Sequence, residues 1–361
     1  MNYLLIRESI FYILIPLVFV ALFTPVVKRI AIHVGALDIP NKRKVHTQPI
    51  PRLGGLGIVF GFLLGYMLFC EPSSLMNAIF IGTFIIVITG IIDDINPIPA
   101  KIKFLGQLVA VLIVVFYGGL SINKLTVFGY LIDFKWLTIP LTIAFLLLCI
   151  NCMNLIDGLD GLSSGIGSIY FLTVGIISIL LGRIGIYYTI SLIMLGCCLG
   201  FLIHNFNPAS IFMGDSGSMF LGYIMGVIAL LGYKSAFLTS LVIPLLIIAI
   251  PLLDVFFAII RRKLKGESIT KPDKCHIHHQ LLRKNLSQRA TVLIIYFVQL
   301  LFSFASIIYA LHNRKLGYII YGILIIIVLV FVLTTDVVFD FPEQEKKFLE
   351  KFKKNKNKKG A

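Results

Sequence analysis

Residues 76–94, MNAIFIGTFIIVITGIIDD, join a long uncharged apolar run to two adjacent aspartates, Asp93 and Asp94. The run approaches the roughly 20 residues that an α-helix needs to cross the hydrocarbon layer of a bilayer. Apolar runs of this kind recur along the chain, and several acids lie in the short gaps between them. The unit that decides the fold is therefore an apolar helix followed by a polar gap.

The composition excludes a soluble globular protein. Of the 361 residues, 58% are hydrophobic and 14% charged, and the mean hydropathy is +0.97. These values predict an all-α polytopic integral membrane protein with about eleven transmembrane helices. The expected spans lie near residues 10–27, 53–70, 76–92, 103–118, 134–150, 164–182, 185–203, 217–233, 238–260, 290–311 and 316–334.

The charge distribution predicts how the chain lies in the lipid bilayer. Most of the 32 Lys and Arg residues fall on one side if the amino terminus is outside and the carboxy terminus cytoplasmic, as the positive-inside rule expects. The net charge of +15 therefore reports orientation in the cytoplasmic membrane, and no nucleic acid partner is expected. All the acid-bearing gaps then share the cytoplasmic side.

The chain shows no repeat of fixed period, which predicts one membrane domain over residues 1–339. Residues 340–361 form a basic cytoplasmic tail, either solvated or bound to anionic lipid. The gap at 119–134 contains an alternating segment, KLTVFGYLIDF, which predicts a small hairpin on the outer surface.

Asp93 and Asp94 open the first acidic gap, where Pro97 and Pro99 prevent simple continuation of the helix. Two neighbouring acids at a membrane edge repel each other, which is tolerable if a cation or a basic substrate group lies between them, or if water solvates both. A helix cap or a solvated turn is the alternative interpretation.

The second gap, NCMNLIDGLDGLSSG at 151–165, places carboxamides and carboxylates three residues apart. On a helical path they would share a face, and the intervening glycines would let backbone amides approach a ligand. Such oxygen ligands suit Mg²⁺ and a nucleotide sugar, although capping of a helix is the alternative. The residues concerned are Asn151, Asn154, Asp157 and Asp160.

The third gap, FLIHNFNPASIFMGDSGS at 201–218, contains Asn205, Phe212 and Asp215. Asp215 at the start of the next helix predicts a metal ligand, with a phosphate on the helix amides nearby. The alternative is that Asp215 is a plain N-cap.

The fourth segment, DKCHIHHQLLRK at 273–284, carries His276, His278 and His279 among basic residues. Imidazoles and cations together predict an anion-binding patch that recognises phosphate, rather than a zinc site. An exposed polar loop is the alternative.

Together, Asp93-Asp94, NCMNLIDGLDGL, NPASIFMGDSGS and HIHH resemble the polyprenyl-phosphate N-acetylhexosaminyl-1-phosphate transferase family. RKVHTQPIPRLGG at 43–55 resembles its first cytoplasmic loop, so the likeness spans residues 28–284. The spacing within DDINPIPAKIKFLGQ and the H-x-H-H form resemble the branch that transfers N-acetylglucosamine 1-phosphate.

The resemblance implies transfer from UDP-N-acetylglucosamine to undecaprenyl phosphate, with release of UMP. The product would be the first lipid-linked intermediate of a cell-envelope glycopolymer such as teichoic acid or O-antigen. Another UDP-N-acetylhexosamine or UDP-MurNAc-pentapeptide is the alternative donor. A homodimer is a further open alternative for the assembly. Mg²⁺ is the expected cofactor, with Mn²⁺ as a substitute.

The resemblance also assigns roles to residues. Asp215 and Asn154 would bind the metal, and Asp93 or Asp94 would lie near the acceptor phosphate as a base or orienting group. Asp157, Asp160 and the three histidines complete the expected catalytic set. The expected substrate-binding residues are Asn151, Gly158, Leu159, Asn205, Phe212, His46 and Arg52.

Two other classes of function are compatible with the sequence. A secondary transporter also carries intramembrane acids, such as Asp254, and proline-bent helices, but its site lies near the bilayer midplane between repeated halves. A catalytically inactive scaffold would tolerate Asp215→Asn without effect in cells.

Overall fold

A computed structural model describes residues 3–40, 48–127, 130–234, 249–264, 277–284, 286–311 and 314–334. The chain is almost entirely helical over these residues, which confirms the all-α prediction. The helices are α1 (Tyr3–His33), α2 (Gly55–Phe69), α3 (Ser74–Ile95), α4 (Ala100–Leu112), α5 (Thr138–Ile156), α6 (Leu162–Leu180), α7 (Ile186–Asn205), α8 (Gly214–Lys234), α10 (Ala249–Leu264), α11 (Ile277–Arg283), α12 (Gln288–Ala310) and α13 (Arg314–Thr334).

The expected apolar runs each correspond to a helix. A π-helical turn, η1 (Ile113–Tyr117), continues α4, and α10 covers the described part of the run at 238–260. Among the described residues, eight helices are long and apolar enough to cross a membrane. Three shorter apolar segments lie at Gly55–Phe69, Pro251–Ile260 and Lys315–Val330. The chain is therefore a multi-pass membrane protein.

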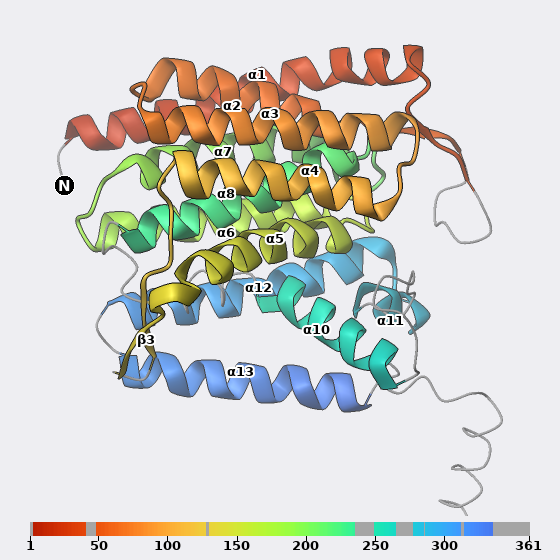
Figure 1. The fold of residues 1–361 in the computed structure, drawn as a ribbon. Coiled ribbons are helices and arrows are strands. Elements are labelled where there is room, and N and C mark those ends of the chain that lie inside the picture. Colours follow the sequence, from red (N-terminus) through yellow and green to blue (C-terminus); the bar gives the residue numbers. More distant parts are fainter. Residues whose placement is uncertain are drawn as a thin grey trace, which may run out of the picture.

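The helices form one bundle in which α8 is central. Figure 1 shows α1, α2 and α3 along one side, and α10, α12 and α13 along the other. In the most apolar stretch of α8, 94% of the residues are buried, compared with 22% in α1. Helix α8 therefore packs against protein on all sides, whereas α1 presents much of its apolar surface to lipid.

Local signals set the two ends of α3. Ser73 caps α3 by accepting a hydrogen bond from the amide of Met76 (3.2 Å). At its other end α3 stops at Ile95, as expected from Pro97, and α4 starts directly after Pro99. The two prolines thus turn the chain back at the acidic gap.

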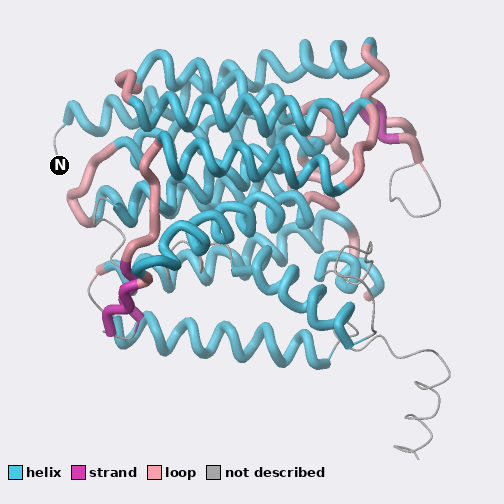
Figure 2. Tube along the Cα trace, viewed as in Figure 1, coloured by secondary structure: helices cyan, strands magenta, loops and turns pink. Residues whose placement is uncertain are grey.

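The acid-bearing gaps meet at one end of the bundle because successive helices alternate in direction. Figure 2 shows loops and short strands gathered at the two ends of the helices. The antiparallel pair β1 (Leu37–Asp38) and β2 (Ile50–Pro51) lies at the acidic end. At the opposite end, β3 (Lys124–Val127) and β4 (Tyr130–Asp133) form the predicted hairpin.

The orientation of the bundle in the membrane stays a prediction from the charge distribution. The division into a domain at 1–339 and a tail at 340–361 also stays a prediction, because the tail lies outside the described residues.

Candidate active site

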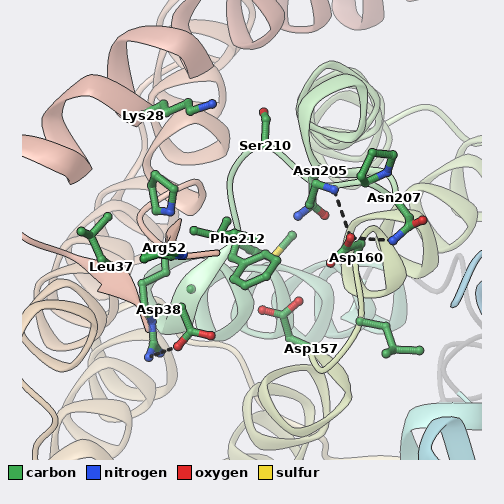
Figure 3. A pocket seen from close by; sticks show the side chains of 18 of the residues that line it. Lys28, Leu37, Asp38, Arg52, Asp157, Asp160, Asn205, Asn207, Ser210 and Phe212 are labelled. Atoms are coloured by element: carbon green, nitrogen blue, oxygen red, sulfur yellow. Dashed lines mark hydrogen bonds and ion pairs between the residues drawn. The ribbon is translucent and has the colours of Figure 1, made fainter. Parts of the chain in front are cut away.

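A pocket of about 1000 Å³ opens at the end of the bundle where the acid-bearing gaps meet. Its wall includes the end of α1, residues 48–52, the turn at 157–160, the segment around 205–215 and Gln288 of α12. Figure 3 shows Asp157 and Phe212 in this pocket, with Arg52 and Asp38 at one side. The predicted site residues that line it are Arg52, Asn154, Asp157, Gly158, Leu159, Asp160, Asn205, Phe212 and Asp215.

The other predicted residues are placed differently. Asp93, Asp94 and Asn151 lie outside the set of described residues that line the pocket. His46 and His276 fall outside the described part of the chain. His278 and His279 belong to helix α11, but their side chains are also outside the description.

Backbone hydrogen bonds join the first loop to the start of α8. The amide of Phe212 donates to the carbonyl of Pro51 (2.7 Å), and the amide of Gly54 donates to the carbonyl of Phe212 (2.9 Å). The amide of Gly55 donates to the carbonyl of Met213 (2.8 Å). This pairing places Arg52, which lies between the paired residues, against Asp215.

Asp94 caps helix α8 from outside that helix. Its carboxylate accepts hydrogen bonds from the amides of Asp215 (2.8 Å) and Ser216 (3.0 Å) and from the Ser216 hydroxyl (2.8 Å). Asp94 is only 4% exposed. Asp94 therefore occupies two of the amides at the start of α8, where a phosphate was expected. The residue before Asp215, Gly214, has a φ of +74°, and a Cβ there would lie 2.5 Å from Asp94 Oδ2.

Arg52 links the capping carboxylate to Asp215. Its Nε lies 3.1 Å from Asp94 Oδ1, and its Nη2 lies 3.3 Å from Asp215 Oδ1. A third acid, Asp38, lies 3.6 Å from Nη1. Burial disfavours the guanidinium charge, but Asp94 and Asp215 outweigh this effect and raise the pKa of Arg52.

Lys103 makes the second cationic link and was not among the residues predicted from the sequence. Its Nζ lies 2.9 Å from Asp93 Oδ2 and also bonds Asp215. Asp93 in turn accepts a hydrogen bond from the amide of Ile98 (3.0 Å). The paired acids are thus offset by two cations of the protein, one for each acid, rather than by one cation between them. The only sequence signal was the pair of lysines in AKIKF; Lys101 proves exposed.

The run from Asn151 to Asp160 does not share one helical face, so that prediction is wrong. Helix α5 ends at Ile156, and the chain turns through a left-handed Gly161 (φ +78°) before α6 begins. Asn151 donates to Gln107 of α4 (2.9 Å), and Asn154 donates to Ser218 of α8 (2.9 Å). Gly158 lines the pocket, whereas Gly161 directly precedes α6.

Asp157 lies at the pocket wall and accepts a hydrogen bond from the Ser163 hydroxyl (2.5 Å). Burial raises the pKa of Asp157 to about 7, and the negative charge of Asp215 adds to this effect. The protonation state of this carboxyl therefore changes near neutral pH.

Asn205 and Asp160 organise the backbone around the pocket. Asn205 Oδ1 accepts from the Gly161 amide (3.1 Å) and the Ser164 hydroxyl (3.0 Å), and its Nδ2 donates to the Ile211 carbonyl (3.0 Å). Asp160 Oδ2 accepts from Asn207 Nδ2 (2.8 Å) and from the Ala209 amide (3.0 Å). Both side chains hold the segment that carries Phe212.

Sequence comparisons identify a protein family and individual proteins that this chain is similar to. Residues 76–233 match the model of glycosyl transferase family 4. The chain is 43% identical to the probable undecaprenyl-phosphate N-acetylglucosaminyl 1-phosphate transferase of Bacillus subtilis, over 82% of this chain and 83% of that protein.

Less similar relatives are named for the transfer of two different groups, N-acetylglucosamine phosphate and phospho-N-acetylmuramoyl-pentapeptide. The decaprenyl-phosphate N-acetylglucosaminephosphotransferase of Mycolicibacterium smegmatis is 36% identical over 75% of this chain and 74% of its own length. The phospho-N-acetylmuramoyl-pentapeptide-transferase of Moorella thermoacetica is 31% identical over 64% of this chain and 76% of its own length.

Proposed function

The chain belongs to glycosyl transferase family 4, and from this membership and the geometry of the pocket we propose that it transfers N-acetylglucosamine 1-phosphate from UDP-N-acetylglucosamine to undecaprenyl phosphate. The reaction releases UMP and leaves a lipid-linked sugar diphosphate for a cell-envelope glycopolymer. The observation that carries the proposal is Asp215, which lines the pocket while two cations, Arg52 and Lys103, hold its carboxylate.

The reaction joins two anionic phosphates, so positioning and charge neutralisation dominate its chemistry. Arg52 and Lys103 supply positive charge beside Asp215. A phosphate monoester with a second pKa near 6 is already largely dianionic at neutral pH. The acceptor therefore needs little help from a base, in keeping with Asp93 and Asp94 being engaged in ion pairs.

The oxygen ligands at the pocket fit Mg²⁺, with Mn²⁺ as a substitute. Asp215 offers its carboxylate. The Asn154 amide nitrogen donates a hydrogen bond to the Ser218 hydroxyl, which leaves the Asn154 carboxamide oxygen to face a cation. Among the described residues, no three carboxylate, histidine or cysteine side chains gather into a metal centre. That arrangement suits Mg²⁺, which binds through one or two carboxylates together with substrate phosphates and water. When bound, the ion neutralises the diphosphate of the donor.

The identity of the donor rests on the relatives and on the pocket. The Bacillus subtilis protein, named for N-acetylglucosaminyl 1-phosphate transfer, is more similar to this chain than the pentapeptide transferase of Moorella thermoacetica is. Phe212 lines the pocket beside Gly158 and Leu159, which gives uracil an aromatic ring and an apolar edge to bind. We place the site on the cytoplasmic face, where the basic loops lie.

The location of the pocket argues against a secondary transporter. Such proteins bind their substrates near the bilayer midplane, between repeated halves. The pocket here is lined by the carboxy-terminal end of α5 and the amino-terminal residues of α8 and α12, so it opens at the helix ends.

The test is UMP release by the purified protein in detergent with undecaprenyl phosphate and Mg²⁺. UDP-N-acetylglucosamine, UDP-N-acetylgalactosamine and UDP-MurNAc-pentapeptide are compared, each with an EDTA control. We expect lipid-dependent release that is sensitive to EDTA and is fastest with UDP-N-acetylglucosamine. Asp215→Asn should lower the rate at least about hundredfold while the protein stays folded. Wild-type activity in this variant would refute the assignment of the site.

A further inference from the structure

The first turn of α12 is tied to the rim of the pocket by Asn207, which has no role in the chemistry above. Asn207 Nδ2 donates to Asp160 Oδ2 (2.8 Å) and to Gln288 Oε1 (2.9 Å). Its carbonyl accepts a hydrogen bond from Arg289 Nε (2.9 Å). Asn207 therefore joins the turn that follows α5 to the beginning of α12, which lies more than eighty residues after Asn207 in the chain.

A second contact fixes α12 to the same turn at a different height. The Tyr296 hydroxyl donates to the carbonyl of Gly161. Gly165 makes room for this ring, because a Cβ there would lie 1.9 Å from the Tyr296 oxygen. Arg289 and Tyr296 are seven residues apart, about 10 Å along a helix. Contacts at two heights set the tilt of α12 as well as its position.

The helix that carries two of the histidines precedes α12 directly. Helix α11 ends at Arg283, four residues before the capping Ser287, and it packs against α12. Figure 1 shows α11 at the end of the bundle that carries the acidic gaps. The placement of α11 relative to the pocket therefore depends on the first turn of α12.

We propose that Asn207 is a positioning residue that couples the Asp160 turn to α12 and thereby fixes the histidine-bearing helix α11 beside the pocket. The Asn207 amide donates to both the Asp160 carboxylate and the Gln288 carboxamide oxygen, so one side chain supplies both bonds of the link. Aspartate at position 207 has nearly the same shape but loses both donors and repels Asp160. Only the effect of this coupling on turnover rests on the proposed function.

Hydrogen–deuterium exchange tests the coupling without any substrate. In Asn207→Asp we expect the amides of residues 277–292 to exchange about tenfold faster, because two hydrogen bonds are lost, while α8 stays protected. Asn123→Asp is the matched control, since Asn123 is exposed and directly precedes β3, which lies at the opposite end of the bundle. Unchanged exchange over 277–292 in Asn207→Asp would overturn the proposal.

Kinetics and a swapped pair separate positioning from a merely structural role. Asn207→Asp should lower kcat for UMP release about tenfold and change the donor KM less, because Phe212 keeps its backbone hydrogen bonds to Pro51 and Gly54. Asn207→Asp combined with Asp160→Asn restores a carboxamide–carboxylate pair, so we expect the exchange rates over 277–292 to return towards wild type. A swapped pair whose amides exchange as fast as in the single variant, or a lower melting temperature of Asn207→Asp with unchanged kcat, would contradict the proposal. If wild-type protein released no UMP, the proposed function would fail while the exchange experiment still decided the coupling.

Discussion

Asp94 is predicted to stabilise the fold rather than to exchange a proton during turnover. Its two oxygens are occupied by the first amides of α8, the Ser216 hydroxyl and Arg52. In Asp94→Asn the side chain keeps its shape but loses its charge and one acceptor oxygen. We therefore expect a less stable protein whose folded fraction still has measurable activity.

The contacts set the size of the effect. A hydrogen bond to a charged group contributes about 1.5–3 kcal/mol, and loss of a helix cap costs about 0.5–2 kcal/mol. Breaking a buried ion pair costs about 3–5 kcal/mol when the partner is left alone. Arg52 keeps Asp215 at 3.3 Å and Asp38 at 3.6 Å, so it is not left alone. We expect about 2–3 kcal/mol for Asp94→Asn and more for Asp94→Ala, which removes every acceptor.

The assay is unfolding of the purified variants in detergent, measured alongside UMP release below the transition temperature. Asp133→Asn is the control, because the Asp133–Lys124 pair is exposed and its atoms are 3.9 Å apart, which predicts a loss of less than about 0.5 kcal/mol. An Asp94→Asn protein as stable as wild type but inactive would refute the capping role and would return Asp94 to the chemistry.

Two further predictions concern Lys103 and Asp157. Lys103→Met should lower UMP release about hundredfold by leaving Asp93 and Asp215 without their shared cation, whereas exposed Lys101→Met should have little effect; equal losses in both variants would contradict this. The pKa of Asp157 is about 7 in the folded protein and about 4 in the unfolded chain, so the native state binds its proton more tightly and stability should fall as pH rises from about 4 to 7. Denaturation at several pH values should show a smaller fall in Asp157→Asn, and an unchanged slope would count against the shift.

The helices could be predicted from the sequence because the signal for a membrane span is local. An uncharged apolar stretch of sufficient length has few alternatives to a helix in lipid, where backbone groups must bond to each other. The turn at Pro97 and Pro99 and the hairpin of β3 and β4 also follow from short-range chemistry. These features depend on residues close together in the chain.

The lining of the pocket was largely predictable from the sequence, but the contacts within it were less so. The gaps identified Asp215, Asp157 and Phe212 as neighbours, since gaps on one side of the membrane must meet. Lys103 was missed because the sequence does not show which of two nearby lysines faces the bundle. The run from Asn151 to Asp160 was misjudged because its spacing fits a continuous helix, whereas α5 ends at Ile156 and α6 begins only after Gly161. Each of these outcomes depends on packing between distant segments.

Asp93 and Asp94 show why adjacent residues need not share a task. Consecutive side chains on an α-helix point about 100° apart, so a pair at the end of α3 faces two different neighbours. Asp93 meets Lys103 of α4, whereas Asp94 meets Arg52 and the first amides of α8. Both cations then converge on Asp215, which lines the pocket. We therefore expect the paired acids to act on the proposed reaction through the cations and the helix that they hold, with Asp215 as the carboxylate that this framework presents to the substrates.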